Sequence, residues 1–447
     1  MSGTKRSEGL SRVTAITFAV GTMVGAGVFV LSGLVVAAVG PGALLSYAIC
    51  AVLVSFSGLS YAMLASIFPE DGGGYLYSER LLGKYPGFLA GWIMYVAQPI
   101  ALSFVLLGFG IYLNLLLSIA LDPRISAAAA LLLVTALNIR GIAEAGRLEV
   151  AIVITKIAIL VLFFFVALFF LNASSFSPFL PSGTDAVLQG VSMVFFAYMG
   201  FQVITMMGGE VKQSSKSVPA AMLASIVIVA LVYTGVILGL LAANLPIYGG
   251  DSVFQAASVL MGPLGGILVA LGAVLSTLSS ANALTAGASR IVKEMASEGQ
   301  IPGRFARLWH REPTNALLLG FCIAFAFILY GSLDAIIGLV NVAMLIAMLF
   351  VNLSALKLIR RNEMDEGKTY FRLPLGPVFP ILGAASCVVI TLTLPLPSII
   401  LGIVAMLLGT VFYAIEDTPQ GKEEIEEIRK ALGRAGAKTD ERGNIVR

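Results

Sequence analysis

The feature that most constrains the fold of this chain is a glycine-rich stretch inside its first long apolar segment. The segment covers residues 13–39, and Gly21, Gly25 and Gly27 occupy three of seven consecutive positions within it. Glycine weakens a helix by about 1 kcal/mol relative to alanine, and in hydrocarbon a freed peptide group is costly unless a polar partner meets it. The stretch predicts two half-helices with an unwound joint near Gly25–Gly27, which lines a cavity and offers bare amides to a ligand. Close packing of a neighbouring helix against the glycines is the alternative.

The composition places most of the chain in a membrane. Of 447 residues, 58% are apolar and only 12% are charged, and the apolar residues form long runs. These charges are too few to cover a soluble protein of this size, so we expect an all-α membrane protein. At about 20 apolar residues per crossing, the sequence predicts twelve transmembrane helices. The predicted spans are 13–39, 42–68, 87–117, 125–142, 148–171, 187–210, 219–244, 264–291, 314–331, 335–358, 374–393 and 396–415.

The distribution of lysine and arginine predicts the orientation of these spans. If the N-terminus lies inside, then of 28 basic residues only Arg124 falls in an outer loop, and only Lys156 falls within a span away from its inner end. Basic residues gather in the loops on the cytoplasmic side of a membrane. We therefore expect a multi-pass protein of the cell membrane, with residues 1–12 as a cytoplasmic N-terminus and residues 416–447 as a cytoplasmic tail.

A second interrupted helix is predicted in the sixth span. Between Phe196 and Gln202, aromatic bulk is followed by Gly200 and by a glutamine at membrane depth. Gly25 and Gly200 lie almost equally far from the starts of their spans, and those spans run in opposite directions. An inverted five-plus-five repeat predicts this arrangement and places the binding site at the interface of the repeats. The repeats would be residues 13–171 and 187–358, and the two helices of residues 374–415 lie outside them.

Lys156 lies about 12 Å deep in the fifth span at 1.5 Å per residue. An ammonium at such depth costs at least about 2.5–3.5 kcal/mol. Snorkelling of the long side chain toward the inner headgroups would reduce this cost. Alternatively, Lys156 faces the bundle and donates to carbonyls freed by a broken helix, where it could gain and lose a proton during transport.

Acidic side chains are absent from the middle of every predicted span. All 25 Asp and Glu residues fall in loops or at span ends, among them Glu149 and Glu210. A substrate with net positive charge would lack a buried carboxylate to pair with, so a zwitterion fits better. Its carboxylate would meet the amides at Gly25–Gly27, and its ammonium would meet carbonyls near Phe196 and Ala197.

Several short motifs taken together resemble the amino acid–polyamine–organocation superfamily. They are Gly25-Ala26-Gly27-Val28-Phe29, Gly73-Gly74-Tyr75, Asn138-Ile139-Arg140-Gly141, the Phe196–Gln202 break, and Glu210 followed by Val218-Pro219-Ala220. The chain most resembles the prokaryotic proton-coupled, broad-specificity amino acid transporters, which have the leucine-transporter fold. In these a lysine of the fifth span takes the place of a sodium ion, and Gly146-Arg147-Leu148-Glu149 followed by Lys156 looks like that pattern.

The resemblance also implies roles for individual residues. It implies that Lys156 contacts the Gly21 carbonyl and a serine of the eighth span, for which Ser279 or a neighbour is the candidate. Bonding of these serines within their own helix is the alternative. Family members often have Ser or Thr where Ala26 stands, so one side-chain contact to the carboxylate is missing. The implied substrate contacts are Met23, Ala26, Gly27, Phe196, Ala197 and Met199, and we expect Phe201 to join Phe196 in an aromatic lid.

We therefore expect a secondary transporter of small neutral amino acids that works by alternating access and is coupled to protons through Lys156. An exchanger of amino acids or amines with the same fold is the first alternative. An ion channel is less favoured, because the chain lacks rings of charge and a filter-like carbonyl motif. An enzyme is disfavoured because no nucleophile–base or metal constellation is present. We expect no cofactor, no metal ion and no nucleic-acid partner, and the sequence determines neither the amino acid nor the oligomeric state.

Overall fold

The computed structural model describes residues 10–141, 146–305, 307–309, 312–361, 370–373, 375–416, 438–439 and 445–446. The described chain is helical apart from isolated bridges and two short strands, β1 (Lys438–Thr439) and β2 (Ile445–Val446), which pair antiparallel. The predicted N-terminus 1–12 and tail 416–447 lie almost wholly outside these residues.

Helices fill the first part of the chain with only short connections between them. They are α1 (Arg12–Met23), the π-helix η1 (Gly27–Leu31), α2 (Ser32–Val39), η2 (Gly40–Gly42), α3 (Ala43–Ile67), α4 (Gly74–Leu82), α5 (Lys84–Leu117), α6 (Pro123–Ile139), α7 (Gly146–Leu168) and η3 (Ala173–Phe176).

The second part repeats this pattern of long helices and short connections. Its elements are α8 (Gly183–Tyr198), α9 (Val203–Met206), η4 (Gly208–Glu210), α10 (Ser214–Ala243), α11 (Ser252–Ser297), η5 (Gly303–Phe305), α12 (Thr314–Tyr330), α13 (Leu333–Arg361), α14 (Val378–Leu392) and α15 (Leu396–Glu416). A helix or a pair of helices therefore lies at each predicted span.

Eight stretches of the described chain are long and apolar enough to cross a membrane, and α6, α12 and α14 are shorter apolar helices. One of the eight, Gly27–Ile67, joins the end of the first predicted span to the whole of the second. The chain bends between them at Gly40, where φ is 65°. This is the architecture of an all-helical membrane protein.

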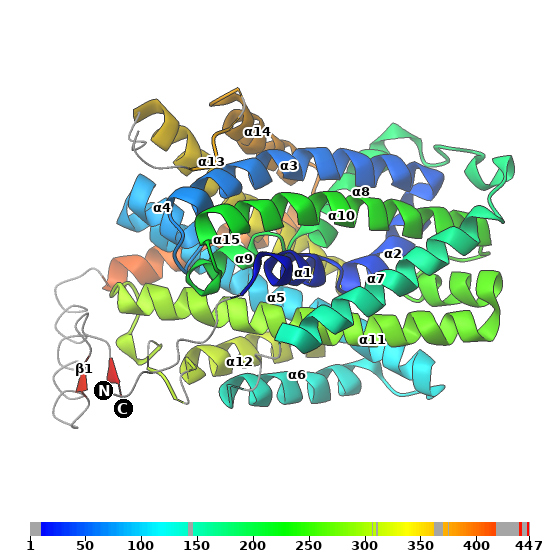
Figure 1. The fold of residues 1–447 in the computed structure, drawn as a ribbon, viewed down its shortest axis with the longest axis horizontal. Coiled ribbons are helices and arrows are strands. Elements are labelled where there is room, and N and C mark those ends of the chain that lie inside the picture. Colours follow the sequence, from blue (N-terminus) through cyan, green and yellow to red (C-terminus); the bar gives the residue numbers. More distant parts are fainter. Residues whose placement is uncertain are drawn as a thin grey trace.

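The first broken segment lies in the middle of the bundle (Figure 1). Helix α1 packs against α7, α10 and α11, while α5 packs against α11, α13 and α6. Residues 19–33 are all buried. The joint after α1 is therefore enclosed by protein, as irregular backbone at membrane depth must be.

Two elements differ from the sequence-based prediction. Helix α11 comprises two helices that meet at Gly262, where φ is 73°; the second begins where the span 264–291 was predicted, and the first, from Ser252, was not predicted. Pro263 follows the kink and cannot donate a backbone hydrogen bond to the preceding turn. In the loop after α3, Gly72 and Gly73 have positive φ, and they lead directly into the additional helix α4, which was not predicted.

Candidate functional site

The first predicted interruption is confirmed, and it lies slightly earlier than the sequence suggested. Helix α1 ends at Met23, and Val24 leaves helical geometry with φ −80° and ψ 67°. Helical structure resumes at Ala26, and the N–H of Gly25 donates to the Met23 carbonyl at 2.9 Å. The amides without an acceptor in their own helix are therefore those of the outer half-helix that starts near Ala26 and Gly27.

The carbonyls freed at this joint are bonded by side chains of two other helices. The Lys156 ammonium on α7 donates to the carbonyls of Gly21 and Val24, at 2.8 Å each. On α11, the Ser280 hydroxyl donates to the Gly21 carbonyl at 3.0 Å, and the Ser276 hydroxyl donates to Val24. Lys156 is completely buried. The predicted contact between Lys156 and Gly21 is confirmed, and snorkelling toward the headgroups is wrong.

Ser279 does not occupy the place expected for it. Its hydroxyl donates to the Glu149 carboxylate at 2.5 Å, and within the described residues Lys156 has Gly21 and Val24 as its hydrogen-bond acceptors. The hydroxyls that share those acceptors belong to the neighbouring Ser276 and Ser280. These two are four residues apart and so lie on one helix face. That spacing was readable in the sequence, but the direction in which the face points was not.

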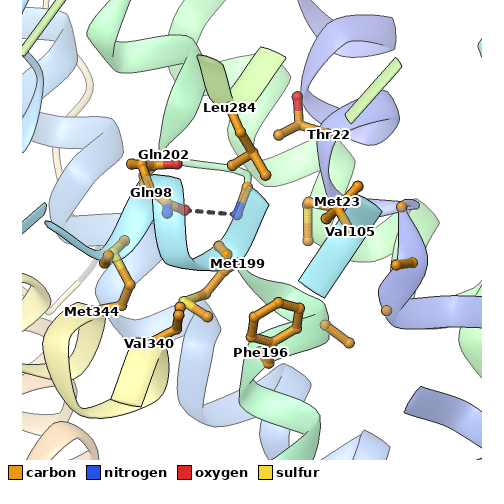
Figure 2. A pocket seen from close by; sticks show the side chains of 17 residues that line it. Thr22, Met23, Gln98, Val105, Phe196, Met199, Gln202, Leu284, Val340 and Met344 are labelled. Carbon is orange, nitrogen blue, oxygen red and sulfur yellow. Dashed lines mark hydrogen bonds between the residues drawn. The ribbon is translucent and has the colours of Figure 1, made fainter. Parts of the chain in front are cut away.

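The second interruption is narrower than the predicted Phe196–Gln202. Helix α8 continues through Phe196 and Ala197 to Tyr198, and the chain then turns at Met199, which is extended, and Gly200, where φ is 126°. The Gly200 N–H donates to the Gln202 side-chain oxygen at 3.0 Å, the bond drawn in Figure 2. The carbonyls of the last turn of α8 therefore face the joint of α1 rather than a continuing helix.

The two interruptions touch each other. The Tyr233 hydroxyl on α10 lies 2.8 Å from the Met23 carbonyl and 2.7 Å from the Ala197 carbonyl, and its single proton serves both. A Cβ on Gly27 would lie 3.0 Å from the Ala197 Cα, and one on Gly200 would lie 3.0 Å from the Met23 nitrogen. The glycines thus serve close packing as well as unwinding.

A cavity lies between the interruptions, and the empty space among its lining residues, with space open to solvent included, is about 470 Å³. Seven of the predicted substrate contacts line it, namely Met23, Gly25, Ala26, Gly27, Phe196, Ala197 and Met199. Figure 2 shows Met23, Phe196 and Met199 around this space.

The remaining lining residues were not among the predicted substrate contacts, although Gly200 and Gln202 belong to the predicted second interruption. They come mostly from α5, α11 and α13, and none of them is charged. They are Thr22, Ala97, Gln98, Ala101, Val105, Gly200, Gln202, Leu284, Val340 and Met344. Gln98 carried a usable signal, because it is a polar residue next to Pro99 in the middle of an apolar span. The apolar residues carried none, because nothing local shows which face of a buried helix borders a cavity.

Phe201 is the predicted contact that lies outside the cavity lining. Its buried ring packs edge-on against Tyr61, with ring centroids 5.8 Å apart. Phe196 does line the cavity, and its partner is Phe104, at 4.6 Å between centroids. The prediction of a Phe196–Phe201 lid is therefore wrong. Gly200, with its positive φ, turns the chain between Phe196 and Phe201.

A cluster of charged groups ties the ends of the two broken segments together. Leu10, just before α1, pairs with the backbone of Glu210 and Lys212 through two hydrogen bonds of 2.9 Å. Arg290 forms an ion pair with Glu210 at 2.8 Å. Asp71 accepts from the Gly209 N–H at 2.9 Å, and burial raises the pKa of this carboxyl above its ordinary value.

The described residues hold no group of three or more His, Cys, Asp or Glu side chains placed to bind a metal ion. Cys50, Cys322 and Cys387 are free thiols. The chemistry of the site therefore rests on peptide groups, hydroxyls, amides and one buried amine.

Comparison with known proteins agrees with this architecture. The chain matches the amino acid permease family over residues 10–415. It is 29% identical to the methylthioribose transporter of Bacillus subtilis (strain 168), over 92% of this chain and 95% of that protein. It is 28% identical to the branched-chain amino acid permease BcaP of the same organism, over 94% of each chain. The serine/threonine exchanger SteT of B. subtilis is 28% identical, over 86% of this chain and 90% of that protein.

These matches cover the cavity and both interrupted helices, and they describe transporters rather than enzymes. The chain therefore belongs to the amino acid permease family of the amino acid–polyamine–organocation superfamily, membership of which implies the leucine-transporter fold and the transport of amino acids across a membrane.

Proposed function

We propose that this protein moves small neutral amino acids by alternating access and that Lys156 couples this movement to protons. The observation that carries the proposal is the fully buried Lys156 ammonium, bonded to the Gly21 and Val24 carbonyls at the joint beside the cavity. A buried amine at membrane depth is costly. Lys156 lies beside the broken helix α1, and there its ammonium bonds the carbonyls that the break has freed.

The cavity favours a zwitterion with an uncharged side chain. The N-terminal end of the outer half-helix, near Ala26 and Gly27, carries partial positive charge and free N–H groups that suit a carboxylate. The carbonyls at the end of α8, near Phe196 and Ala197, suit an ammonium. Because the lining side chains are all uncharged, a charged substrate side chain would be buried without a partner.

The coupling would act through the inner half-helix α1. Its C-terminal end carries partial negative charge, which a positive Lys156 stabilises. Loss of the proton removes that charge and weakens the hold of α7 on Gly21 and Val24. Ser276 and Ser280 keep the two carbonyls bonded, so α1 is released without leaving bare peptide groups. Proton release to the cytoplasm would thereby favour movement of α1.

The proposal includes the membrane arrangement predicted from the sequence. It has twelve spans in the plasma membrane, with both termini in the cytoplasm and an inverted repeat of residues 13–171 and 187–358. The distribution of basic residues supports it. Single cysteines introduced at Lys212 and Arg124, in a variant without native cysteines, should react with an impermeant reagent from opposite sides of the membrane.

Uptake into proteoliposomes tests the coupling. With wild-type protein, an inward proton gradient should drive accumulation of a neutral amino acid such as alanine, in the absence of sodium. Lys156→Met should abolish gradient-driven accumulation, while Lys212→Met, the same change at an exposed loop position, should leave it intact. Sodium dependence without a response to pH, or unchanged uptake by Lys156→Met, would refute the coupling.

Exchange without net proton movement is the second candidate, because the similar protein SteT is a serine/threonine exchanger. Stimulation of uptake by internal amino acid, equal in wild-type protein and in Lys156→Met and independent of any gradient, would favour exchange. Dependence on the gradient with empty vesicles would favour symport.

A further inference from the structure

Gln98 of α5 is a buried amide that points into the cavity without a partner. It is 3% exposed, it lines the cavity, and its side chain makes no hydrogen bond within the described part of the chain. Gln202 lines the same cavity (Figure 2). Since the oxygen of Gln202 accepts from Gly200, its amide N–H₂ group remains available.

A buried carboxamide without a partner calls for an explanation. It offers two donor protons and an acceptor oxygen, and leaving such groups unpaired in a protein interior is costly. The fold does not explain Gln98, because this side chain holds no neighbouring element in place. In an open cavity water meets these groups, and a ligand that fills the cavity must replace the hydrogen bonds of that water.

We propose, on the basis of the amino acid transport proposed above, that Gln98 and the amide N–H₂ of Gln202 recognise the side chain of the substrate. They select an uncharged side chain that can form hydrogen bonds, a hydroxyl or a carboxamide. Leu284, Val340 and Met344 line the same cavity and supply an apolar wall for the alkyl part of that side chain.

The same geometry disfavours other amino acids. A branched aliphatic side chain would displace water from Gln98 and leave both ends of the amide unpaired. A carboxylate or ammonium side chain would lack an opposite charge among the lining residues. Sites built to hydrogen-bond a substrate group reject the isostere that lacks it much more strongly than apolar pockets distinguish by size.

Pairs of isosteric amino acids test this selectivity, because the two members of a pair have similar size and differ in their ability to form hydrogen bonds. Threonine is compared with valine, and asparagine with leucine, by ligand-induced thermal stabilisation of the purified full-length protein. Wild-type protein should bind the polar member of each pair at least about tenfold more tightly. Gln98→Leu should bring the ratio close to one or reverse it. Gln189→Leu, the same change at an exposed position of α8, should retain the wild-type ratio.

The outcomes separate this inference from the proposed function. Equal affinities within both pairs in wild-type protein, or a ratio unchanged by Gln98→Leu, would overturn the recognition role of Gln98 and leave amino acid transport standing. Absence of stabilisation by any of the twenty amino acids would instead overturn the proposed function. The wild-type ratios decide the matter even if Gln98→Leu does not fold, and Gln98→Met offers a near-isosteric second variant.

Discussion

The two interrupted helices are held open in different ways. At the first, the carbonyls of Gly21 and Val24 are bonded by side chains from α7 and α11, one of which is the ionisable Lys156. At the second, Gly200 turns the chain with a φ of 126°, and its N–H is bonded by Gln202, two residues further on. The first interruption therefore depends on other helices, whereas the second is supported largely by its own residues.

Under the proposed function, this difference would give the two joints different tasks. A joint bonded by distant helices changes whenever those helices move or lose charge, so the first joint suits coupling. A joint bonded locally keeps its shape while its surroundings shift, so the second suits a fixed wall of the cavity. Tyr233 and the glycine contacts join the two. Substitutions at these contacts show how far each joint depends on the other.

The largest effect on stability is expected for Gly200→Ala. An alanine here must adopt a φ of 126°, and its Cβ would lie 3.0 Å from the backbone nitrogen of Met23. The backbone conformation costs about 1–2 kcal/mol, and the clash with a second backbone adds about 1–3 kcal/mol. We expect the free energy of unfolding to fall by about 3 kcal/mol, measured by thermal unfolding in detergent.

Gly83→Ala supplies the matched control. Gly83 has a φ of 113°, and nothing lies within 4 Å of the added Cβ. It should lose only the conformational part, about 1–2 kcal/mol. Equal losses at Gly200 and Gly83 would mean that the contact between the two joints contributes little to the fold.

Tyr233→Phe is expected to have the next largest effect. The substitution removes the one hydroxyl that reaches both the Met23 and the Ala197 carbonyl, and the Ala197 carbonyl keeps no other hydrogen bond in the described residues. A buried polar group left without its partner costs about 1–3 kcal/mol, so unfolding should become easier by about 2 kcal/mol. Tyr330→Phe, at an exposed position, should have little effect. Similar unfolding midpoints for both variants would show that Tyr233 does not hold the two interrupted helices together.

The sequence was informative where a residue conflicts with a membrane helix. Glycine weakens a membrane helix at Gly25 and Gly200, and burial of the Lys156 amine is costly. The structure has a helix break at each glycine and a buried carbonyl acceptor for the amine. Ser279 and Phe201 were misplaced because their environment depends on the rotation of α11 and on the turn at Gly200. Both of these are set by tertiary packing.

Tyr233 shows a second limit of prediction from sequence. Tyr233 bonds a residue 210 positions away, and nothing near it in an apolar span indicates such a partner. Gly262-Pro263 ends an apolar run in most contexts, and the second helix of α11 does begin after this break, where the span 264–291 was predicted. The helix that precedes the break, from Ser252, was not predicted.

Gly27→Ala should have a smaller effect than either preceding substitution. The added Cβ would lie 3.0 Å from the Ala197 Cα and 3.1 Å from its Cβ, but the φ of Gly27 is not positive. Alanine also favours helix over glycine by about 1 kcal/mol, which offsets part of the clash. We expect a net loss of about 1 kcal/mol in unfolding experiments. Gly303→Ala, with nothing within 4 Å of the added Cβ, should be close to neutral, and a loss at Gly27 as large as at Gly200 would contradict the role assigned to φ.

The smallest effect is expected for Asp71→Asn, in the charged cluster beside the end of the second broken segment. Burial raises the pKa of Asp71 above its ordinary value of 3.8, against the opposing pull of Arg290 and Lys293. The folded protein therefore binds a proton here more tightly than the unfolded chain, so ionised Asp71 reduces stability above its folded pKa. This cost disappears as the pH falls toward 3.8. Asparagine can still accept from the Gly209 N–H, so the variant should be slightly more stable than wild type at neutral pH. Unfolding midpoints measured across pH should converge in acid, whereas a constant difference would mean that the segment is held by the shape of Asp71 rather than by its charge.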